Sequence, residues 1–216
     1  MQVLALLVPI GSGFISGVLQ KRPPARPTFP WMWLATSLLV AIMLALQLRN
    51  PILLEHLARA PAIIKQGQLW RGVTALFVQD GSLAGGIFNL VLLASIGPIA
   101  ERCLGPLRWA IAYLGGGAMT ELAALAWQPH GAGNSIACFA LAGTLVVTGL
   151  AGRRGWLPLA AALAGTAGAA VLLGRQDIHG IGFVVGMAIG AAVIWFRRLS
   201  VSADYSKSKV SVRCSS

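Results

Sequence analysis

The chain has 216 residues, of which 56% are hydrophobic and only 11% are charged, and 26 are Gly. Its mean hydropathy is +0.75 and its formal net charge is +11. Soluble domains carry about a quarter of their residues as charged side chains, so this composition excludes a disordered chain and argues against a soluble domain. It is typical of a membrane protein.

The 17 basic residues are dispersed between apolar runs, apart from a short basic stretch near the end of the chain. This pattern favours contact with anionic lipid headgroups over binding to nucleic acid. The cysteines, Cys103, Cys138 and Cys214, are too few and too scattered for a disulfide framework or a Cys-based zinc site. Because carboxylates are also absent at ligand spacing, the sequence predicts no metal site.

Six apolar segments are long enough to cross about 30 Å of hydrocarbon as helices. They predict an all-α, polytopic membrane protein and cover residues 31–48, 83–100, 107–127, 134–152, 156–173 and 178–196. The apolar stretch 1–20 is interrupted by Pro9 and three glycines, and no positive charge precedes it, so it is a poor signal peptide. An extra span, an interfacial helix and a loose N-terminus all remain open for it.

The sequence therefore divides into an N-terminal segment (1–30), a six-helix membrane domain (31–196) and a polar, basic, flexible cytoplasmic tail (197–216). Placing the residues before Trp31 in the cytoplasm leaves twelve of the 17 basic residues inside. The five outside are Arg49, Arg59, Lys65, Arg71 and Arg175. The positive-inside rule thus predicts that both ends of the six-helix core are cytoplasmic. We expect the protein in a cell (plasma or inner) membrane.

The connection over residues 49–82 is unusually long for a link between two helices. Apolar stretches alternate in it with single charged residues. This pattern predicts an amphipathic loop in the outer interface, with Trp70 and Arg71 at the level of the lipid headgroups.

Asn89, Ser135 and His179 stand out because polar groups are expensive in hydrocarbon. Each lies near the beginning of a predicted span, and these three spans run in the same direction, so the residues share one depth in the outer part of the bilayer. Each also has a structural interpretation. Ser135 can bond back to a carbonyl one turn earlier, Asn89 can join two helices, and His179 can cap its helix.

A glycine face accompanies the histidine. His179, Gly182, Gly186 and Gly190 share one side of a helix, which allows a neighbouring backbone to approach closely. Close approach of the fourth and sixth spans would bring Ser135 within reach of the imidazole, in the arrangement of a nucleophile and its base. Tight packing alone also accounts for the glycines.

Several short motifs, taken in order over residues 31–196, resemble the rhomboid family of intramembrane serine proteases. They are Leu69-Trp70-Arg71, Asn89, Glu101-Arg102 with Gly105, Gly133-x-Ser135, and His179-x-x-Gly182-x-x-x-Gly186. The resemblance implies a six-helix rhomboid-like bundle and a Ser–His dyad without an acidic third member. It implies no cofactor, and substrates that are transmembrane helices of other proteins, cut near the outer face.

The resemblance also implies the role of each site residue. Ser135 would be the nucleophile and His179 the general base of a hydrolase. The backbone N–H of Ser135 and the side chain of Asn89 would stabilise the oxyanion. Gly133, Gly182 and Gly186 would support the packing around them.

Two positions depart from the family pattern. Ile136 stands where the family usually has the last glycine of Gly-x-Ser-Gly, and Gly85 stands where it often has a histidine four residues before the asparagine. They predict slower turnover, and they favour the alternative of a noncatalytic rhomboid-like protein that binds transmembrane segments. Ser135 and His179 oppose that alternative. A third interpretation, a small transporter using His179 for protons, lacks the paired interrupted spans of inverted repeats.

Two acidic residues rank lower. Glu121 lies in the outer half of the third span, where we expect it to snorkel or to bond to a neighbouring helix. Asp177 is predicted to mark the N-terminal end of the last span and to point to another side of that helix than His179.

Overall fold

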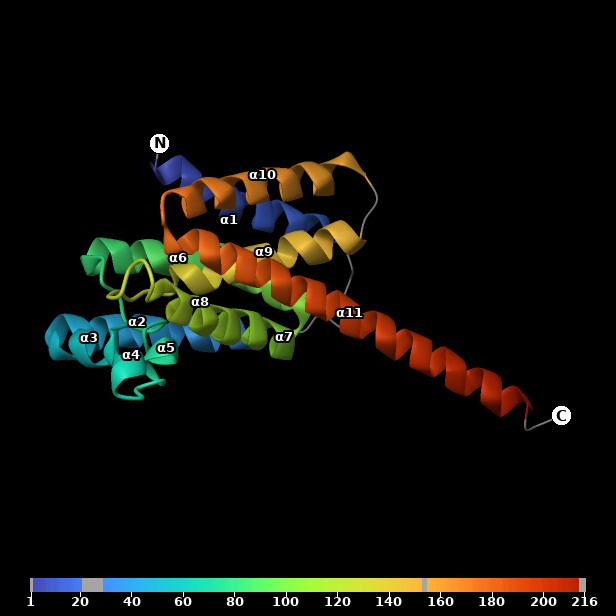
Figure 1. Cartoon of the computed structure of the whole chain (residues 1–216), viewed down its shortest axis with the longest axis horizontal. Helices are drawn as coiled ribbons and strands as arrows, with labels where there is room; N and C mark the ends of the chain where they lie inside the picture. Colours follow the sequence, from blue (N-terminus) through green and yellow to red (C-terminus); the bar gives the residue numbers. More distant parts are fainter. Residues whose placement is uncertain (1, 21–28, 153–154, 214–216) are drawn as a thin grey trace.

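The computed structural model describes residues 2–20, 29–152 and 155–213, which form helices and no strand (Figure 1). Lys21, Arg22, Arg26, Arg153, Arg154 and Cys214, which the sequence analysis used, lie outside the described residues. The elements are α1 (Gln2–Leu19), α2 (Trp31–Arg49), α3 (Ile52–Leu57), α4 (Ala62–Lys65), α5 (Arg71–Thr74), α6 (Ser82–Leu104), α7 (Pro106–Ala110), η1 (Ile111–Gly115), α8 (Gly116–Ala124), α9 (Ser135–Gly152), α10 (Trp156–Gly174) and α11 (Ile178–Arg213).

The predicted spans correspond to the long helices of the bundle. Among the described residues, α2, α6, α9, α10 and the part of α11 over Ile178–Leu199 are long and apolar enough to cross a membrane. The third predicted span is divided into α7, η1 and α8, which follow one another without a gap over residues 106–124 with a π-helical turn between two α-helical parts. The all-α, multi-pass architecture is thus confirmed.

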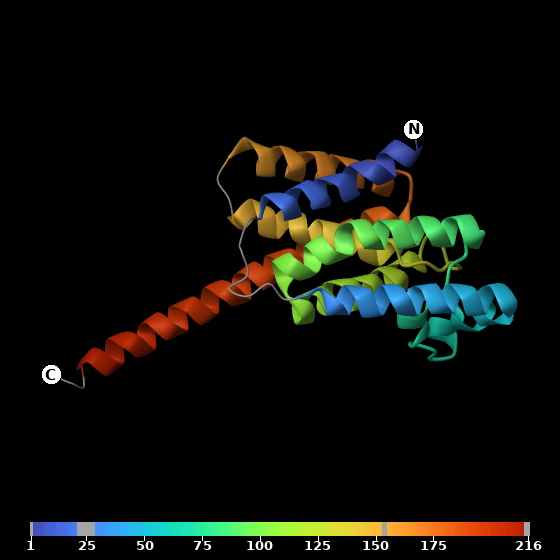
Figure 2. The same ribbon diagram turned by 180° about the vertical axis from the view of Figure 1, so that it is seen from behind.

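The long helices run in two opposite directions. α6, α9 and α11 all begin at the end of the bundle that lies on the left in Figure 1, whereas α2, α7–α8 and α10 run the other way. The short helices α3, α4 and α5 lie at that same end, which the view from behind also shows (Figure 2). These three helices therefore begin at the same end of the bundle, and α6 begins farther out than α9 and α11 (Figure 1).

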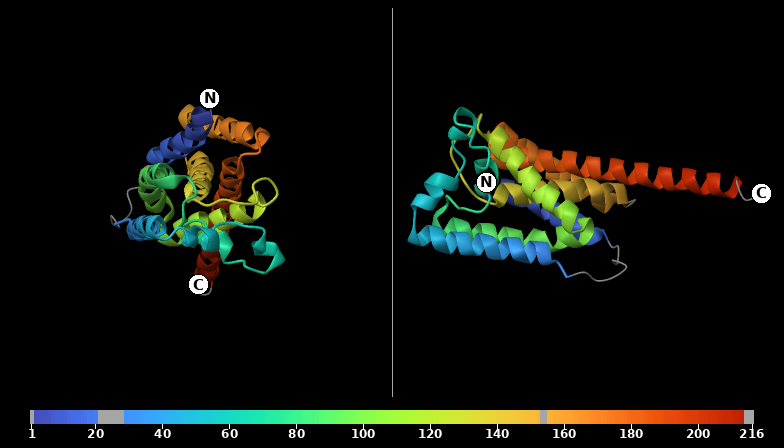
Figure 3. Two further views of the ribbon diagram at one scale, coloured as in Figure 1. Left: turned by 90° about the vertical axis from the view of Figure 1, so that its left-hand side faces the viewer. Right: turned by 90° about the horizontal axis from the view of Figure 1, so that it is seen from below.

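Helix α9 forms the centre of the bundle, as the end-on view in Figure 3 shows. Of its apolar window 72% is buried, compared with 17% for α2. Its sequence is rich in Ala, Gly and Thr, whose small side chains let several helices approach it at once. Helices α1, α6, α8, α10 and α11 all pack against it.

Glycines bring α11 onto the backbone of α9. A Cβ atom at Gly182 would lie 2.8 Å from the carbonyl oxygen of Ile136, and one at Gly190 would lie 3.0 Å from that of Thr144. Between them, the Thr144 hydroxyl lies 2.9 Å from the carbonyl oxygen of Gly186. The glycine face identified in the sequence therefore lies against α9 and fixes the position of the beginning of α11.

Helix α1 lies lengthwise in the bundle, beside α9 and α10 (Figures 1 and 2). Gly13 faces Ala142 of α9 so closely that a Cβ atom would lie 2.6 Å from the alanine Cα. Gln20 donates a hydrogen bond of 2.9 Å to the carbonyl oxygen of Leu145. Of the three interpretations of residues 1–20, the loose N-terminus disagrees with this packing, and α1 is a seventh helix of the bundle.

The opposite end of the bundle is fixed by a buried carboxylate. Glu101 of α6 accepts hydrogen bonds from the backbone N–H groups of Met32 (3.1 Å) and Trp33 (2.6 Å), which begin α2 and have no acceptor within that helix. Helix α6 then ends at Leu104, and the φ of +82° at the next residue, Gly105, favours glycine. In the Glu101-Arg102 motif with Gly105, the carboxylate thus caps the beginning of α2 and the glycine ends α6.

The end of the chain differs from the sequence prediction. A flexible tail was expected from residue 197, but α11 continues as a helix to Arg213 and extends beyond the other helices (Figure 3). Once a helix is nucleated, each further residue adds a hydrogen bond, so an apolar first half that packs against α9 can propagate into a polar second half.

Candidate active site

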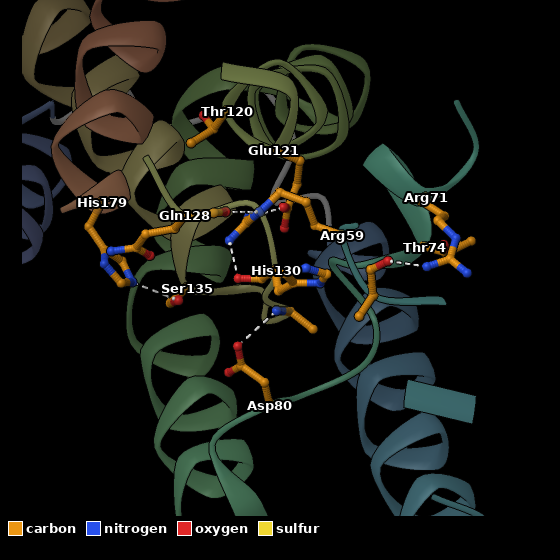
Figure 4. Close-up of polar contacts among 12 residues, drawn as sticks. Arg59, Arg71, Thr74, Asp80, Thr120, Glu121, Gln128, His130, Ser135 and His179 are labelled. Carbon is orange, nitrogen blue, oxygen red and sulfur yellow. Dashed lines mark hydrogen bonds and ion pairs between the residues drawn. The ribbon is translucent and has the colours of Figure 1, made fainter. Parts of the chain in front are cut away.

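The structure brings Ser135 and His179 together. The Ser135 Oγ lies 2.9 Å from the His179 Nε2 (Figure 4). Ser135 is the first residue of α9 and His179 the second of α11, so the glycine contacts between these helices set the distance. The ring of Phe139, one turn after the serine, lies 4.8 Å from the imidazole, centroid to centroid, and packs against it.

The other ring nitrogen of His179 contacts an acidic side chain. The Asp177 Oδ1 lies 2.6 Å from the His179 Nδ1 and also accepts the His179 backbone N–H at 3.0 Å. The prediction that Asp177 points to another side of the helix is wrong, because this residue precedes α11 and does not follow its helical rotation. Its carboxylate instead folds over the first turn as a cap.

The charge of Asp177 is stabilised by this contact. Burial raises the pKa of Asp177, but the side-chain hydrogen bond to His179, the charge of the imidazole and the backbone hydrogen bond outweigh it, and the net pKa lies below its usual value. The carboxylate is therefore ionised at neutral pH.

Gly133 shapes the approach to the serine. Its φ is +141°, a conformation that side chains rarely adopt, and a Cβ atom there would lie 3.0 Å from the Asn89 Nδ2. Its N–H donates to the carbonyl oxygen of Ala75 at 2.9 Å. Glycine at this position is thus required both by the backbone and by the side chain of Asn89.

Asn89 is held by a glutamine that the sequence analysis missed. The Asn89 Nδ2 donates to the Gln79 Oε1 at 2.6 Å, and the fully buried Gln79 donates from its own amide to the Asn134 Oδ1 at 3.3 Å. Gln47 of α2 in turn donates to the Gln79 carbonyl and accepts its backbone N–H at 2.8 Å. Gln47 could have been found from the sequence, because a polar glutamine inside a predicted span needs a hydrogen-bond partner. Gln79 lies in the long connection, where a glutamine is not unusual.

A cavity of about 320 Å³ lies beside these groups. Asn89, Ser135 and His179 line it, together with Leu6 and Leu7 of α1. Both positions that depart from the family pattern also lie on it: Gly85, where an added Cβ would meet nothing within 4 Å, and Ile136, which is 1% exposed. The cavity is large enough for a short stretch of extended peptide at the serine.

Arg59 ties the long connection to the loop before Ser135. Its guanidinium pairs with Glu121 of α8 and donates to the carbonyl oxygens of Gln128 (2.8 Å) and His130 (3.2 Å) (Figure 4). Its backbone N–H donates to the Gly131 carbonyl at 2.8 Å. The charge pattern of the sequence indicates Arg59 only as an outside charge, although a carboxylate within a predicted span, Glu121, is a signal for a buried cationic partner.

Arg71 and Trp70 are expected at the level of the lipid headgroups, which stays a prediction. The Arg71 side chain is buried and donates to the carbonyl oxygen of Ala58 at 3.0 Å, whereas Trp70 is 55% exposed. The last carbonyl groups of a helix accept no hydrogen bond within it. The guanidinium donates to such a carbonyl, that of Ala58, which directly follows α3. Nearby, the Thr74 hydroxyl donates to the Leu57 carbonyl at 2.9 Å. These bonds hold the connection in one fold.

Comparison with known proteins agrees with the motifs. Residues 66–199, more than half of the chain, match the Rhomboid domain family. The rhomboid protease GluP of Bacillus subtilis (strain 168) is 29% identical over 136 residues, a match that covers 61% of this chain and 27% of that relative. The chain thus matches about a quarter of that relative's length. The family match includes Asn89, Ser135 and His179, and the chain belongs to the rhomboid family.

Proposed function

We propose that the chain is an intramembrane serine endopeptidase in which Ser135 is the nucleophile and His179 the general base. The observation that carries this proposal is the distance of 2.9 Å between the Ser135 Oγ and the His179 Nε2 at the edge of a cavity. Hydroxyls are weak nucleophiles unless an adjacent base takes their proton, and this distance allows the transfer. Membership of the rhomboid family and the protease-named relative support the same activity.

The steps follow from these two side chains. The Ser135 Oγ attacks the carbonyl carbon of the scissile peptide while its proton passes to the Nε2 of His179. The tetrahedral intermediate collapses, the C–N bond breaks, and the Nε2 returns the proton to the leaving amine. The same nitrogen then takes a proton from water, and the resulting hydroxide attacks the acyl carbon. The acyl–oxygen bond breaks, and the Nε2 returns its proton to the Ser135 Oγ.

The oxyanion needs donors close to the serine. Asn89 uses one amide hydrogen on Gln79 and keeps the second for the oxyanion. The N–H groups of the first turn of α9, including that of Ser135, have no acceptor within the helix, and the positive end of the helix dipole favours negative charge there. These groups would stabilise the intermediate without reorganising.

The substrates would be transmembrane segments of other proteins. Ser135 lies near one end of the bundle, and the distribution of basic residues would place that end at the outer face of a cell (plasma or inner) membrane, with both ends of the six-helix core in the cytoplasm. Anionic headgroups would contact the basic inner side. The domain over 31–196 would carry the activity, with 1–30 and 197–216 as flanking segments.

One observation favours a second candidate, a noncatalytic protein that binds transmembrane segments. The space beside Gly85 is open, so no side chain from this position adds a donor to the cavity that holds Asn89. A cavity that binds an extended peptide without a strong oxyanion site would capture a segment and release it uncut.

The test is cleavage of a reporter with a small-residue-rich transmembrane helix in reconstituted membranes. Wild type is compared with Ser135→Ala and His179→Ala, for which we expect product formation to fall by about 10³-fold or more. Ser95→Ala is the matched control, because Ser95 is an exposed serine of α6 that bonds only within its own helix. Absence of product from folded wild type across several such helices, together with measurable binding of them, would establish the second candidate instead.

A further inference from the structure

The imidazole of His179 is held at both of its nitrogens. Its Nε2 faces the Ser135 Oγ at 2.9 Å, and its Nδ1 faces the Asp177 Oδ1 at 2.6 Å. The side chains of His179 and Asp177 are 22% and 19% exposed, so both are shielded from most of the solvent. Hydroxyl, imidazole and carboxylate therefore form one connected series of hydrogen bonds.

This arrangement has a chemical consequence for the ring. A carboxylate has only acceptors, so a hydrogen bond to the Nδ1 requires the proton to sit on that nitrogen. The Nε2 then carries the lone pair, and it is the nitrogen that faces the serine. When the Nε2 takes the serine proton, the negative charge next to the Nδ1 stabilises the resulting imidazolium, more strongly in a shielded site than in water.

We propose that Asp177 is a positioning residue for His179, so that acyl transfer uses a Ser135–His179–Asp177 triad in place of the dyad that the family resemblance implies. The inference rests on the proposed function. The serine proton moves to the Nε2 and then to the leaving amine, while the proton on the Nδ1 stays on the ring and Asp177 stays ionised throughout.

Other charged groups near the ring have partners of their own. Arg59, Asp80 and Glu121 line the same cavity from the connection and from α8. Arg59 and Glu121 are paired with each other, and the Asp80 Oδ2 accepts the backbone N–H of Ala132 at 2.9 Å. Within the described part of the chain, Asp177 is the carboxylate bonded to the imidazole.

A purely structural role must be separated from this one, because Asp177 also caps α11 through the His179 N–H. Asp177→Asn and Asp177→Ser both preserve a side-chain acceptor suited to a helix cap, but neither provides a charged acceptor for the Nδ1. We expect both variants to keep the thermal stability of wild type within a few degrees. We expect kcat to fall by about 10² to 10⁴-fold with KM nearly unchanged.

Two readouts distinguish positioning from capping. The acidic limb of the kcat/KM profile should move to lower pH in Asp177→Asn, since an imidazolium without its carboxylate loses its proton more readily. Asp177→Glu, which restores the charge, should recover part of kcat. Wild-type kcat and an unchanged pH profile in Asp177→Asn, with Ser135→Ala inactive, would overturn the triad and leave the protease proposal intact.

A measurement without turnover keeps the two proposals separate. The sequence has three histidines, His56, His130 and His179, so ¹⁵N-histidine spectra of the full chain in detergent are assigned by comparison with His179→Ala. We expect neutral His179 to carry its proton on the Nδ1 in wild type and to lose this preference in Asp177→Asn. If wild type cleaves nothing but shows this tautomer, the protease proposal fails, while the orientation of His179 by Asp177 stands. A proton on the Nε2 in wild type would overturn the triad.

Discussion

Arg59 and Glu121 form an ion pair in which both side chains are only 1% exposed, although the first lies in the connection after α2 and the second lies in α8. The same guanidinium binds two carbonyls of the loop that leads to Ser135. The pair therefore links three segments of the chain at the end of the bundle that carries the candidate site.

Removing one partner of this pair should destabilise the protein. Glu121→Ala leaves a buried, uncompensated guanidinium, which typically costs about 3–5 kcal/mol. We expect a clearly lower midpoint of thermal unfolding in detergent and a lower kcat, because the loop before Ser135 loses its anchor. The double variant Arg59→Met with Glu121→Leu should recover much of the stability. Equal stabilities of Glu121→Ala and wild type would contradict the buried pair.

Gly133→Ala should impair the reaction more than the fold. The φ of +141° makes any side chain strained, by about 1–3 kcal/mol, and the added Cβ would press on the Asn89 amide at 3.0 Å. We expect kcat to fall by about 10²-fold as that donor is displaced. Gly152→Ala is the control, since its Cβ would meet nothing within 4 Å at the end of α9. Comparable kcat in both variants would show that the Asn89 amide is not needed.

Asn89 and Gln79 should act as a coupled pair. Asn89→Ala is expected to lower kcat by about 10²-fold or more with little change in KM, as for the loss of one oxyanion donor. Gln79→Ala should have a smaller effect in the same direction, because Gln79 orients the amide. In the double variant, kcat should fall by less than the product of the two single effects. Gln66→Ala is the control, because Gln66 is exposed, and its kcat should match that of wild type. A fall in kcat equal to the product of the two single effects would show that the two residues act independently.

A substitution at Gly85 is expected to raise kcat. It lies one turn before Asn89 on α6, and an added Cβ meets nothing within 4 Å. Gly85→His should place a donor in the cavity and raise kcat by up to about tenfold, a fraction of what a full oxyanion donor contributes. Gly85→Ala controls for the higher helix propensity of any non-glycine residue. A rise in Gly85→Ala equal to that in Gly85→His would assign the gain to the helix.

The long helices and the approach of Ser135 to His179 were accessible from sequence because each rests on a local pattern. Long apolar runs predicted the long helices, and the glycine spacing after His179 predicted the close approach to the helix of Ser135. These signals need no knowledge of distant partners.

The missed contacts depend on the chain outside regular helices. A helical wheel does not apply to Asp177, which precedes α11, and its contact with His179 was therefore not predicted. Gln79 lies in a long connection whose path follows from tertiary contacts, so its position beside Asn89 had no local signal. The small residues of α1 could face lipid, solvent or another helix, and only the packed bundle distinguishes these.

The position of α1 also determines when the bundle can be completed during synthesis. Gln20 bonds to Thr148 of α9, 128 residues later in the chain, and α10 follows later still. At 5–20 residues per second, the ribosome takes on the order of ten seconds to supply these partners. Until then the cavity lacks the wall that Leu6 and Leu7 provide and also lacks His179, the last of its reactive groups to be made. A nascent chain that ends before residue 179 therefore holds Ser135 without the side chain that we propose as its base.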